Sequence, residues 1–217
     1  RLRFNGALFY EDWQGVQLGV TGPNGITDIW NVGNASVKGV ESDVNWLALD
    51  HLELSAAGTY VDAKTTTDFC GEQLDNKKAP NYGLLRASCP NDPSSASGSR
   101  LPVTPSFKGN ATARYKFEVG NYASFLQLSA LHQSSARSAL EAHPQSIMGS
   151  TPAFTTFDFS VGTALNKWTL DLYVENVFDK RAELERFGVC GADYCYDNAR
   201  VYPVKPQLFG IRFGQKF

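Results

Sequence analysis

The cysteines are the residues of this 217-residue chain whose spacing points most directly to a chemistry. The four cysteines form two local pairs, Cys70 with Cys89 and Cys190 with Cys195, and each pair lies in a turn-rich segment. The three histidines are scattered and no C-x-x-C motif occurs, which argues against a metal site. The pattern favours short-range disulfides in an oxidising compartment, or free thiols, over metal binding.

Catalytic constellations are scarce in the sequence. It contains no G-x-S-x-G elbow, no H-E-x-x-H motif and no Gly-rich phosphate loop. His132 lies near Ser129, Ser134 and Ser135, but serine is so abundant in this stretch that chance explains the neighbourhood better than a Ser–His pair. We therefore expect no enzyme activity and no cofactor. The formal net charge of −2, with no basic stripe, gives no reason to expect nucleic acid as a partner.

Most of the chain alternates apolar and polar residues with a period of two, which predicts β-strands. In the clearest stretch Phe107, Ala111 and Phe117 share one face, while Lys108 and Arg114 lie on the other. Seven further segments alternate in the same way, around residues 2–11, 40–46, 52–60, 126–130, 157–161, 168–175 and 209–217. The expected strands have roughly 10 to 18 residues, more than the 5 or 6 usual in soluble sheets and enough to cross a bilayer when tilted.

Short and long connections alternate between these strands. The short ones are residues 47–51, 118–121 and 165–167, and the long ones are 65–102, 138–152 and 180–202. In the first connection, Gly22-Pro23-Asn24-Gly25 is typical of a tight turn that caps an extended hairpin. All short connections then fall at one end of the sheet, as in transmembrane barrels with short periplasmic turns. An even number of strands places both ends of the chain on that periplasmic side.

Aromatic residues gather near the ends of the expected strands. Trp46, Phe117, Tyr122, Trp168 and Phe217 lie near short turns, whereas Tyr10, Trp13, Tyr60, Phe107 and Phe209 lie towards the long loops. Two such belts fit the aromatic girdles at the two membrane interfaces. Alternation by itself also fits a soluble ligand-binding barrel with its apolar face inside. Strand length, the belts and the unequal connections favour the membrane.

Three motifs, at residues 31–41, 176–181 and 203–217, resemble the barrel of TonB-dependent outer-membrane receptors. Residues 31–41 are similar to the family's N-x-G-x-A-x-x-x-G-x-E strand, and residues 176–181 resemble its N-[LV]-F-D-K-R segment. The last residues of the chain resemble the family's closing strand, through Pro203, Pro206, Gly210 and the terminal Phe217. The motif positions are Asn31, Gly33, Gly39, Glu41, Asn176, Phe178, Asp179 and Phe217. Ala182 departs from the family, which usually has an aromatic residue there.

The resemblance implies an all-β fold, with residues 1–217 as the last eight strands of a 22-stranded antiparallel up-and-down transmembrane β-barrel in the cell outer membrane. The plug domain is absent from this chain, and a chain that opens in mid-strand without a leader also indicates a fragment. The family's function would be to bind a scarce ligand, an iron–siderophore or another large nutrient, and to import it with TonB energy. The alternative is a passive or structural barrel, either a porin or a small complete barrel of eight strands.

The same resemblance implies three partners: outer-membrane lipid, TonB through the absent plug domain, and the barrel-assembly machinery through the C-terminal Phe217. Aromatic and cationic loop residues suit siderophores or sugars, so the candidate ligand contacts are Tyr82, Arg86, Arg100, Phe187, Tyr194 and Tyr196. On the polar face, Glu41 and Asp43 are expected either to pair with cations of neighbouring strands, such as Arg114, or to stay solvated. Gly33 and Gly39 are expected to relieve crowding or to permit a bulge.

Overall fold

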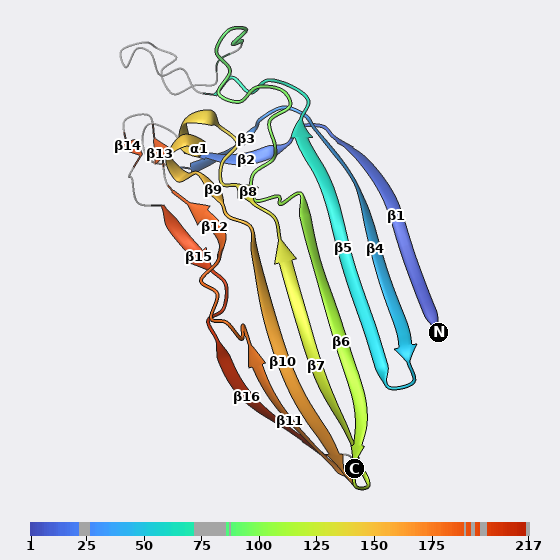
Figure 1. The fold of residues 1–217 in the computed structure, drawn as a ribbon. Coiled ribbons are helices and arrows are strands. Elements are labelled where there is room, and N and C mark those ends of the chain that lie inside the picture. Colours follow the sequence, from blue (N-terminus) through green and yellow to red (C-terminus); the bar gives the residue numbers. More distant parts are fainter. Residues whose placement is uncertain are drawn as a thin grey trace.

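The computed structural model describes residues 1–21, 27–71, 86, 88–188, 190–191, 194–195 and 199–215. Eight strands form one antiparallel sheet in the order β1-β4-β5-β6-β7-β10-β11-β16 (Figure 1). Their bounds are β1 Leu2–Trp13, β4 Ala35–Leu49, β5 Leu52–Thr65, β6 Phe107–Val119, β7 Tyr122–Gln133, β10 Phe154–Leu165, β11 Trp168–Glu175 and β16 Leu208–Gln215. Each strand pairs with the one that precedes it in this order, so the predicted up-and-down β topology is confirmed.

The remaining elements belong to the connections. They are β2 Gln17–Thr21, β3 Thr27–Asn31, β8 Ala136–Arg137, α1 Ala142–Met148, β9 Ser150–Thr151, β12 Glu183–Phe187, β13 Cys190–Gly191, β14 Tyr194–Cys195 and β15 Arg200–Pro203. Four two-stranded sheets result: β2–β3, β8–β9, β12–β15 and β13–β14. The predicted turn at residues 22–25 lies outside the described residues, although β2 and β3 form the hairpin that flanks it. Among the described residues, no helix has the length and apolarity needed to span a bilayer.

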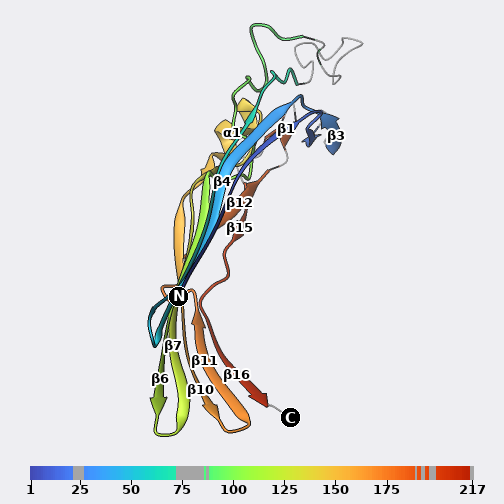
Figure 2. The same ribbon diagram turned by 90° about the vertical axis from the view of Figure 1, so that its right-hand side faces the viewer.

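Short and long connections lie at opposite ends of the sheet. The turns β4–β5, β6–β7 and β10–β11 share one end with the start of β1 and the end of β16 (Figures 1 and 2). The long connections, with α1 and the small sheets, lie at the other end. The expected alternation of connections is therefore confirmed, and the start of β1 and the end of β16 lie beside the short turns.

The apolar face of the sheet has exposed large hydrophobic side chains on each of its eight strands. Leu8 is 87% exposed and Ile211 is 72% exposed, and Phe4, Leu128 and Phe213 are likewise open. No dry centre forms around these side chains in the described part of the chain. A soluble barrel buries its apolar face, so the structure argues against that alternative.

The eight-stranded sheet is open. Among the described strands, β1 pairs only with β4 and β16 pairs only with β11, at opposite edges of the sheet. A small complete barrel would require β1 to pair with β16, and this pairing is not formed. The eight strands therefore form a curved wall instead of a closed cylinder (Figure 2).

The buried apolar core lies at the long-loop end, outside the middle of the wall. It consists of Val16, Val32, Ala35, Ala63, Phe69, Leu101 and Leu140, which come from three connections and the adjoining ends of β4 and β5. We call this set the loop core. It excludes water from the region where the long loops meet, so the loops are packed against one another and against the wall.

Candidate functional site

The polar face of the wall carries a row of facing side chains near the short-turn end. Register places Lys116, Phe125, Gly162, Asp171 and Arg212 opposite one another across β6, β7, β10, β11 and β16. Lys116 makes an ion pair with Glu53 of β5, and Arg212 Nη1 lies 3.8 Å from Asp171 Oδ2. The row therefore has charged groups on β6, β11 and β16, with Phe125 and Gly162 between them on β7 and β10.

Arg114 lies on β6 two residues before Lys116, at one end of this row. Its guanidinium carbon lies 3.7 Å from the centroid of the Phe125 ring, which is a cation–π contact. Its Nη1 donates to Gln127 Oε1 at 3.4 Å, while its Nε is buried and has no hydrogen-bond partner among the described residues. A cavity of about 460 Å³ opens beside it, lined by His51, Lys116, Phe125 and Asp171 among others.

A second hollow on the polar face has a volume of about 330 Å³ and is lined by Asn5, Glu41, Asp43 and Thr59. Asp43 accepts hydrogen bonds from Asn5 Nδ2 at 3.1 Å instead of pairing with Arg114. The suggested pairing with Arg114 is wrong, because the register places Arg114 opposite Glu53, several residues nearer the short turns. Each strand step is about 3.3 Å, so the two groups are too far apart.

Phe125 is not among the candidate residues that the sequence predicts. It precedes an alternating series in which Leu126, Leu128 and Ala130 share the apolar face, so Phe125 falls on the polar face. Tyr173 is a second aromatic on that face, and Arg212 lies over its ring at 5.6 Å. An aromatic out of phase with the alternation is the signal by which both residues are recognisable.

The glycines of the first family motif lie where a side chain would clash. Gly33 has φ +108°, and a Cβ there would overlap the hydroxyl of Thr67, which accepts a hydrogen bond from Asn34 N at 2.9 Å. A Cβ at Gly39 would overlap the Phe9 ring and a backbone carbonyl. The first glycine allows the chain to bend between β3 and β4, and the second lets an aromatic ring lie flat on the strand.

Asn176 of the second motif joins three parts of the sheet. Its side chain is buried at 4% exposure, donates to Lys205 O at 2.9 Å and Lys180 O at 3.2 Å, and accepts from Lys180 N at 2.8 Å. Its backbone N–H donates to Asp158 Oδ1 of β10 at 2.8 Å. Its φ of +50° is a conformation that asparagine tolerates better than most residues.

Asp179 and Phe178 complete this junction. Asp179 accepts from the Gln207 N–H at 3.0 Å and from Arg181 Nη2 at 2.9 Å, and these two contacts hold the pKa of its carboxyl below the ordinary value. Phe178 is 74% exposed and meets Phe157 edge to face, with ring centroids 5.6 Å apart. The nearby Ala182, where the family usually has an aromatic residue, is buried. These motif residues connect β11 to the strands beyond it.

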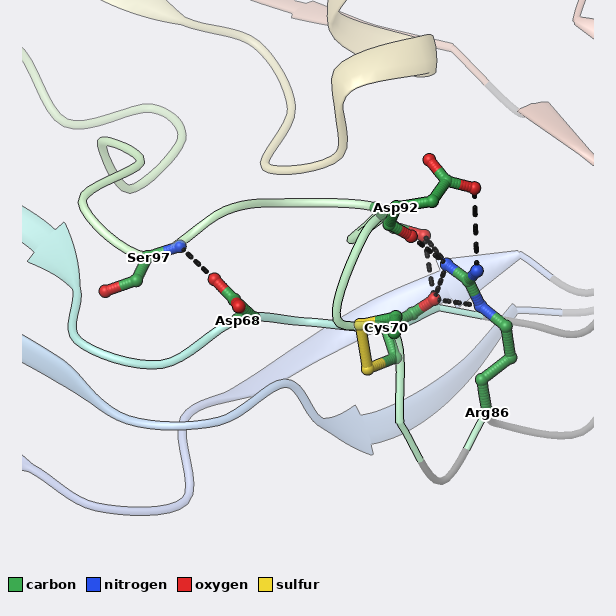
Figure 3. Close-up of a disulfide and its surroundings, with 7 residues drawn as sticks. Asp68, Cys70, Arg86, Asp92 and Ser97 are labelled. Carbon is green, nitrogen blue, oxygen red and sulfur yellow. Dashed lines mark hydrogen bonds and ion pairs between the residues drawn. A yellow bond between two sulfur atoms is a disulfide. The ribbon is translucent and has the colours of Figure 1, made fainter.

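The Cys70–Cys89 disulfide is present in the long connection between β5 and β6 (Figure 3). Arg86 Nε donates to Cys70 O at 2.6 Å, and its Nη2 donates to Asp92 O at 2.8 Å. Asp68 accepts from Ser97 N at 2.6 Å and closes the base of the same loop. The Arg86 side chain is 17% exposed, so this candidate ligand contact is engaged in holding the loop together.

The other candidate contacts are dispersed. Arg100 lies opposite Lys64 of β5, beyond the end of the apolar face, and Phe187 is exposed on β12. The backbone of Tyr194 lies in β14, and Cys190 faces Cys195 as its register partner in β13–β14. Tyr82, Tyr196 and Phe217 lie outside the described residues. The described loops thus bring none of these candidates together around one cavity.

Glu141, the residue before α1, was not anticipated from the sequence. Ala142 N donates to Ser94 O at 2.8 Å, which ties α1 to the disulfide-containing connection. Burial raises the pKa of the Glu141 carboxyl, and His143 opposes that shift. Within the described ranges, no group of three histidine, cysteine or acidic residues is arranged to hold a metal ion.

A sheet of long tilted strands with an exposed apolar face, a hollowed polar face and all short turns at one end is the wall of a transmembrane β-barrel. The sequence profile of the TonB dependent receptor-like β-barrel domain matches residues 1–177. The chain belongs to the TonB-dependent receptor family and is located in the outer membrane. The family consists of receptors and transporters, not enzymes.

Solved structures show the same fold. The chain is similar to the ferric yersiniabactin uptake receptor FyuA from Yersinia pestis (TM-score 0.69, 17% identity, 100% of this chain and 28% of that one). It is also similar to the siderophore receptor PiuA from Acinetobacter baumannii (TM-score 0.64, 18% identity, 98% of this chain and 25% of that one). A third similar structure is the ferric-catecholate import receptor Fiu from Escherichia coli K12 (TM-score 0.64, 17% identity, 100% of this chain and 25% of that one). The chain therefore spans about a quarter of the length of these structures. A comparison with curated proteins finds no match.

Proposed function

We propose that residues 1–217 form the C-terminal barrel wall of a receptor that binds a scarce ligand and imports it across the outer membrane with TonB energy. The observation that carries this proposal is the hollowed polar face, backed by an apolar face that suits lipid. Such a wall separates a polar lumen from hydrocarbon, and a receptor with a wide barrel requires that separation. We call the polar face the lumen wall from here on.

The two open edges support membership in a larger barrel. Unpaired backbone groups along β1 and β16 are costly in hydrocarbon, so further strands of the receptor must pair with both edges. The proposed assembly is a 22-stranded barrel of which these are the last eight strands. Its plug domain and TonB-contacting segment lie in a part of the receptor outside residues 1–217.

An iron–siderophore is the ligand class that we propose first. FyuA, PiuA and Fiu are named as uptake receptors for ferric chelates or siderophores, and their fold is shared. The cationic and aromatic groups of the lumen wall, with Arg114 over Phe125, suit passage of an anionic or aromatic chelate. Another large nutrient is the second possibility within the same mechanism.

The test is radiolabelled iron uptake by an iron-starved host that expresses the intact receptor and lacks its own siderophore receptors. Uptake of at least one ferric siderophore from a panel is expected, and it is expected to stop when TonB is deleted. Equal uptake with and without TonB would instead indicate a passive barrel. TonB-dependent uptake of another large nutrient, without uptake of any ferric siderophore, would support the proposed transport and assign a different ligand to it.

The C-terminal Phe217 is proposed to contact the barrel-assembly machinery. Phe217→Ala is expected to lower the amount of folded receptor in the outer membrane several-fold, while the receptor that does assemble unfolds at the same urea concentration as wild type. A lowered unfolding midpoint with normal assembly would assign Phe217 to stability instead.

A further inference from the structure

Cationic side chains gather on the outward side of the wall, just beyond the outer aromatic belt. Lys38 of β4 faces Tyr10 of β1 and Asp62 of β5, and Lys64 is the next residue on the same face of β5. Opposed residues of an antiparallel pair share a face. These groups therefore lie on the same side as Tyr60, which belongs to the apolar face.

Arg100 is held beside Lys64 by the backbone. Thr65 N donates to Ser99 O at 2.9 Å and Leu101 N donates to Ala63 O at 3.0 Å, so residues 99–101 continue the sheet beyond β5. These two bonds flank the Lys64–Arg100 bridge and direct both side chains outward. Arg100 is thus a fixed part of the outer surface rather than a member of a ligand-gathering loop.

The charges of this patch are not balanced. Lys64 Nζ lies 2.9 Å from Asp62 Oδ1, and Lys38 Nζ lies 3.9 Å from Asp62 Oδ2, so two cations share one carboxylate. Arg100 makes no ion pair within the part of the chain that the structure describes. Among the described strands, the other carboxylate on this face is Asp12 of β1. Asp12 faces Ser36 of β4, and Ser36 in turn faces Lys64 of β5, so Asp12 and Lys64 are separated by the whole of β4.

An added anion would relieve the repulsion at the Lys64–Arg100 end. Like charges directly opposite one another on paired strands are destabilising. The side chains are accessible, because Lys38 is 60% exposed and Lys64 is 43% exposed. A group with several acceptor oxygens suits a guanidinium and two ammonium groups better than a single carboxylate does.

The depth of the patch decides what kind of anion reaches it. Along β5, Asp62 is two residues beyond Tyr60 and Lys64 is four residues beyond it. At about 3.3 Å per residue and a tilt of about 40°, the cations lie roughly 5 to 10 Å outward of the aromatic belt. The polar headgroup layer of a leaflet is about 5 to 7 Å thick, so the patch begins at the level of lipid headgroups.

We propose that Lys38, Lys64 and Arg100 bind the phosphate of an anionic lipid in the outer leaflet. Its acyl chains lie along the apolar face below the patch, against Val40, Tyr60 and Phe107, which occupy one register row. A free phosphate ion has no chains to occupy that surface. The proposal rests on the outer-membrane location of the chain and is independent of the transported ligand.

The experiment compares intact receptors purified from outer membranes in mild detergent, with bound phospholipid or phosphorylated glycolipid counted by native mass spectrometry. Lys64→Gln and Arg100→Gln are each expected to weaken lipid binding about fivefold, the effect of one basic residue at an anionic surface. Arg100→Lys keeps the charge and is expected to restore most of the binding. Lys108→Gln, which removes the same charge from the lumen wall on β6, is the matched control and is expected to bind like wild type.

Unchanged lipid in the Lys64→Gln/Arg100→Gln double variant would overturn the proposal, and so would an equal loss in Lys108→Gln. A second measurement separates the source of the phosphate. Phosphatidic acid in phosphatidylcholine nanodiscs is expected to raise the thermal midpoint of the wild-type receptor and to leave the double variant unchanged. An equal rise with inorganic phosphate alone would assign the site to free anions instead of lipid.

Discussion

Placing the same lysine on the two faces of the wall tests which face contacts hydrocarbon. Ala111 on β6 and Ala57 on β5 are both exposed and differ by one position in the register, because Ala57 faces Asn110. Ala111 lies on the apolar face and Ala57 lies on the lumen wall. Ala111→Lys and Ala57→Lys therefore make the same chemical change at nearly the same depth.

The expected magnitude follows from the position of Ala111 between the belts. Phe107 and Phe117 are ten residues apart on β6, which at about 3.3 Å per residue and a tilt of about 40° spans roughly 25 Å, the height of the apolar band of such barrels. Ala111 is four residues from Phe107 and is therefore about 10 Å inside the outer belt, near the midplane. A lysine at the midplane costs about 2 to 4 kcal/mol, and because its flexible stem reaches towards the interface we expect about 2 to 3 kcal/mol for Ala111→Lys.

Ala57→Lys is expected to change stability by no more than about 0.5 kcal/mol. Its ammonium group enters the polar hollow, where Ala57 is opposite Asp43. The assay is equilibrium urea unfolding of the intact receptor in phospholipid vesicles, followed by tryptophan fluorescence. Equal losses of unfolding free energy in the two variants, or a larger loss for Ala57→Lys, would refute the assignment of the faces.

Three further changes test the junctions within the wall and the loops. Gly162→Ala is expected to lower the free energy of unfolding by about 1 to 3 kcal/mol, because the new Cβ would overlap the Phe125 ring. Gly6→Ala is the control, because a Cβ at Gly6 meets no atom nearer than 3.4 Å. Asn176→Ala is expected to lower the free energy of unfolding by about 2 to 4 kcal/mol in the same urea assay, because three backbone groups lose their side-chain partner. A loss of unfolding free energy below about 0.5 kcal/mol would contradict the role of Asn176 at the junction. Because burial raises the pKa of Glu141 in the folded loop, docking of α1 is expected to be strongest below the ordinary carboxyl pKa and to weaken as pH rises through the raised value. Hydrogen exchange of α1 measures this weakening, and Glu141→Gln is expected to abolish it.

The alternation of residue types was sufficient to predict the wall. A side-chain period of two leaves only one way to place Leu126 and Leu128 on one face and Gln127 on the other, so the two faces followed from local sequence. The short turns were equally local, since each is two residues between two alternating runs. What remained open was whether the apolar face was buried in a dry core, and its exposed large side chains on every strand of the wall show that it is not.

The packing at the long-loop end was not predictable in the same way. The loop core brings Val16, Phe69 and Leu140 together from segments far apart in the sequence, and no local pattern marks such contacts. The α1 helix is too short to stand alone and depends on its neighbours, with Arg186 Nη1 donating to Met148 O at 2.9 Å. Arg86 was assigned to ligand contact because its charge suits an anionic chelate, but its donors are used by the backbone around the disulfide.

The wall and the long loops are stabilised by different interactions, because the wall lies in hydrocarbon and the loops lie in water. In hydrocarbon the apolar face gains little from burial, so the wall is stabilised by its ladder of backbone hydrogen bonds, which have no water to compete for them. The loops are in water and gain stability from the burial of Phe69 and Leu140 and from the covalent link at Cys70. A change in the loop core therefore acts on the arrangement of the loops without opening the ladder.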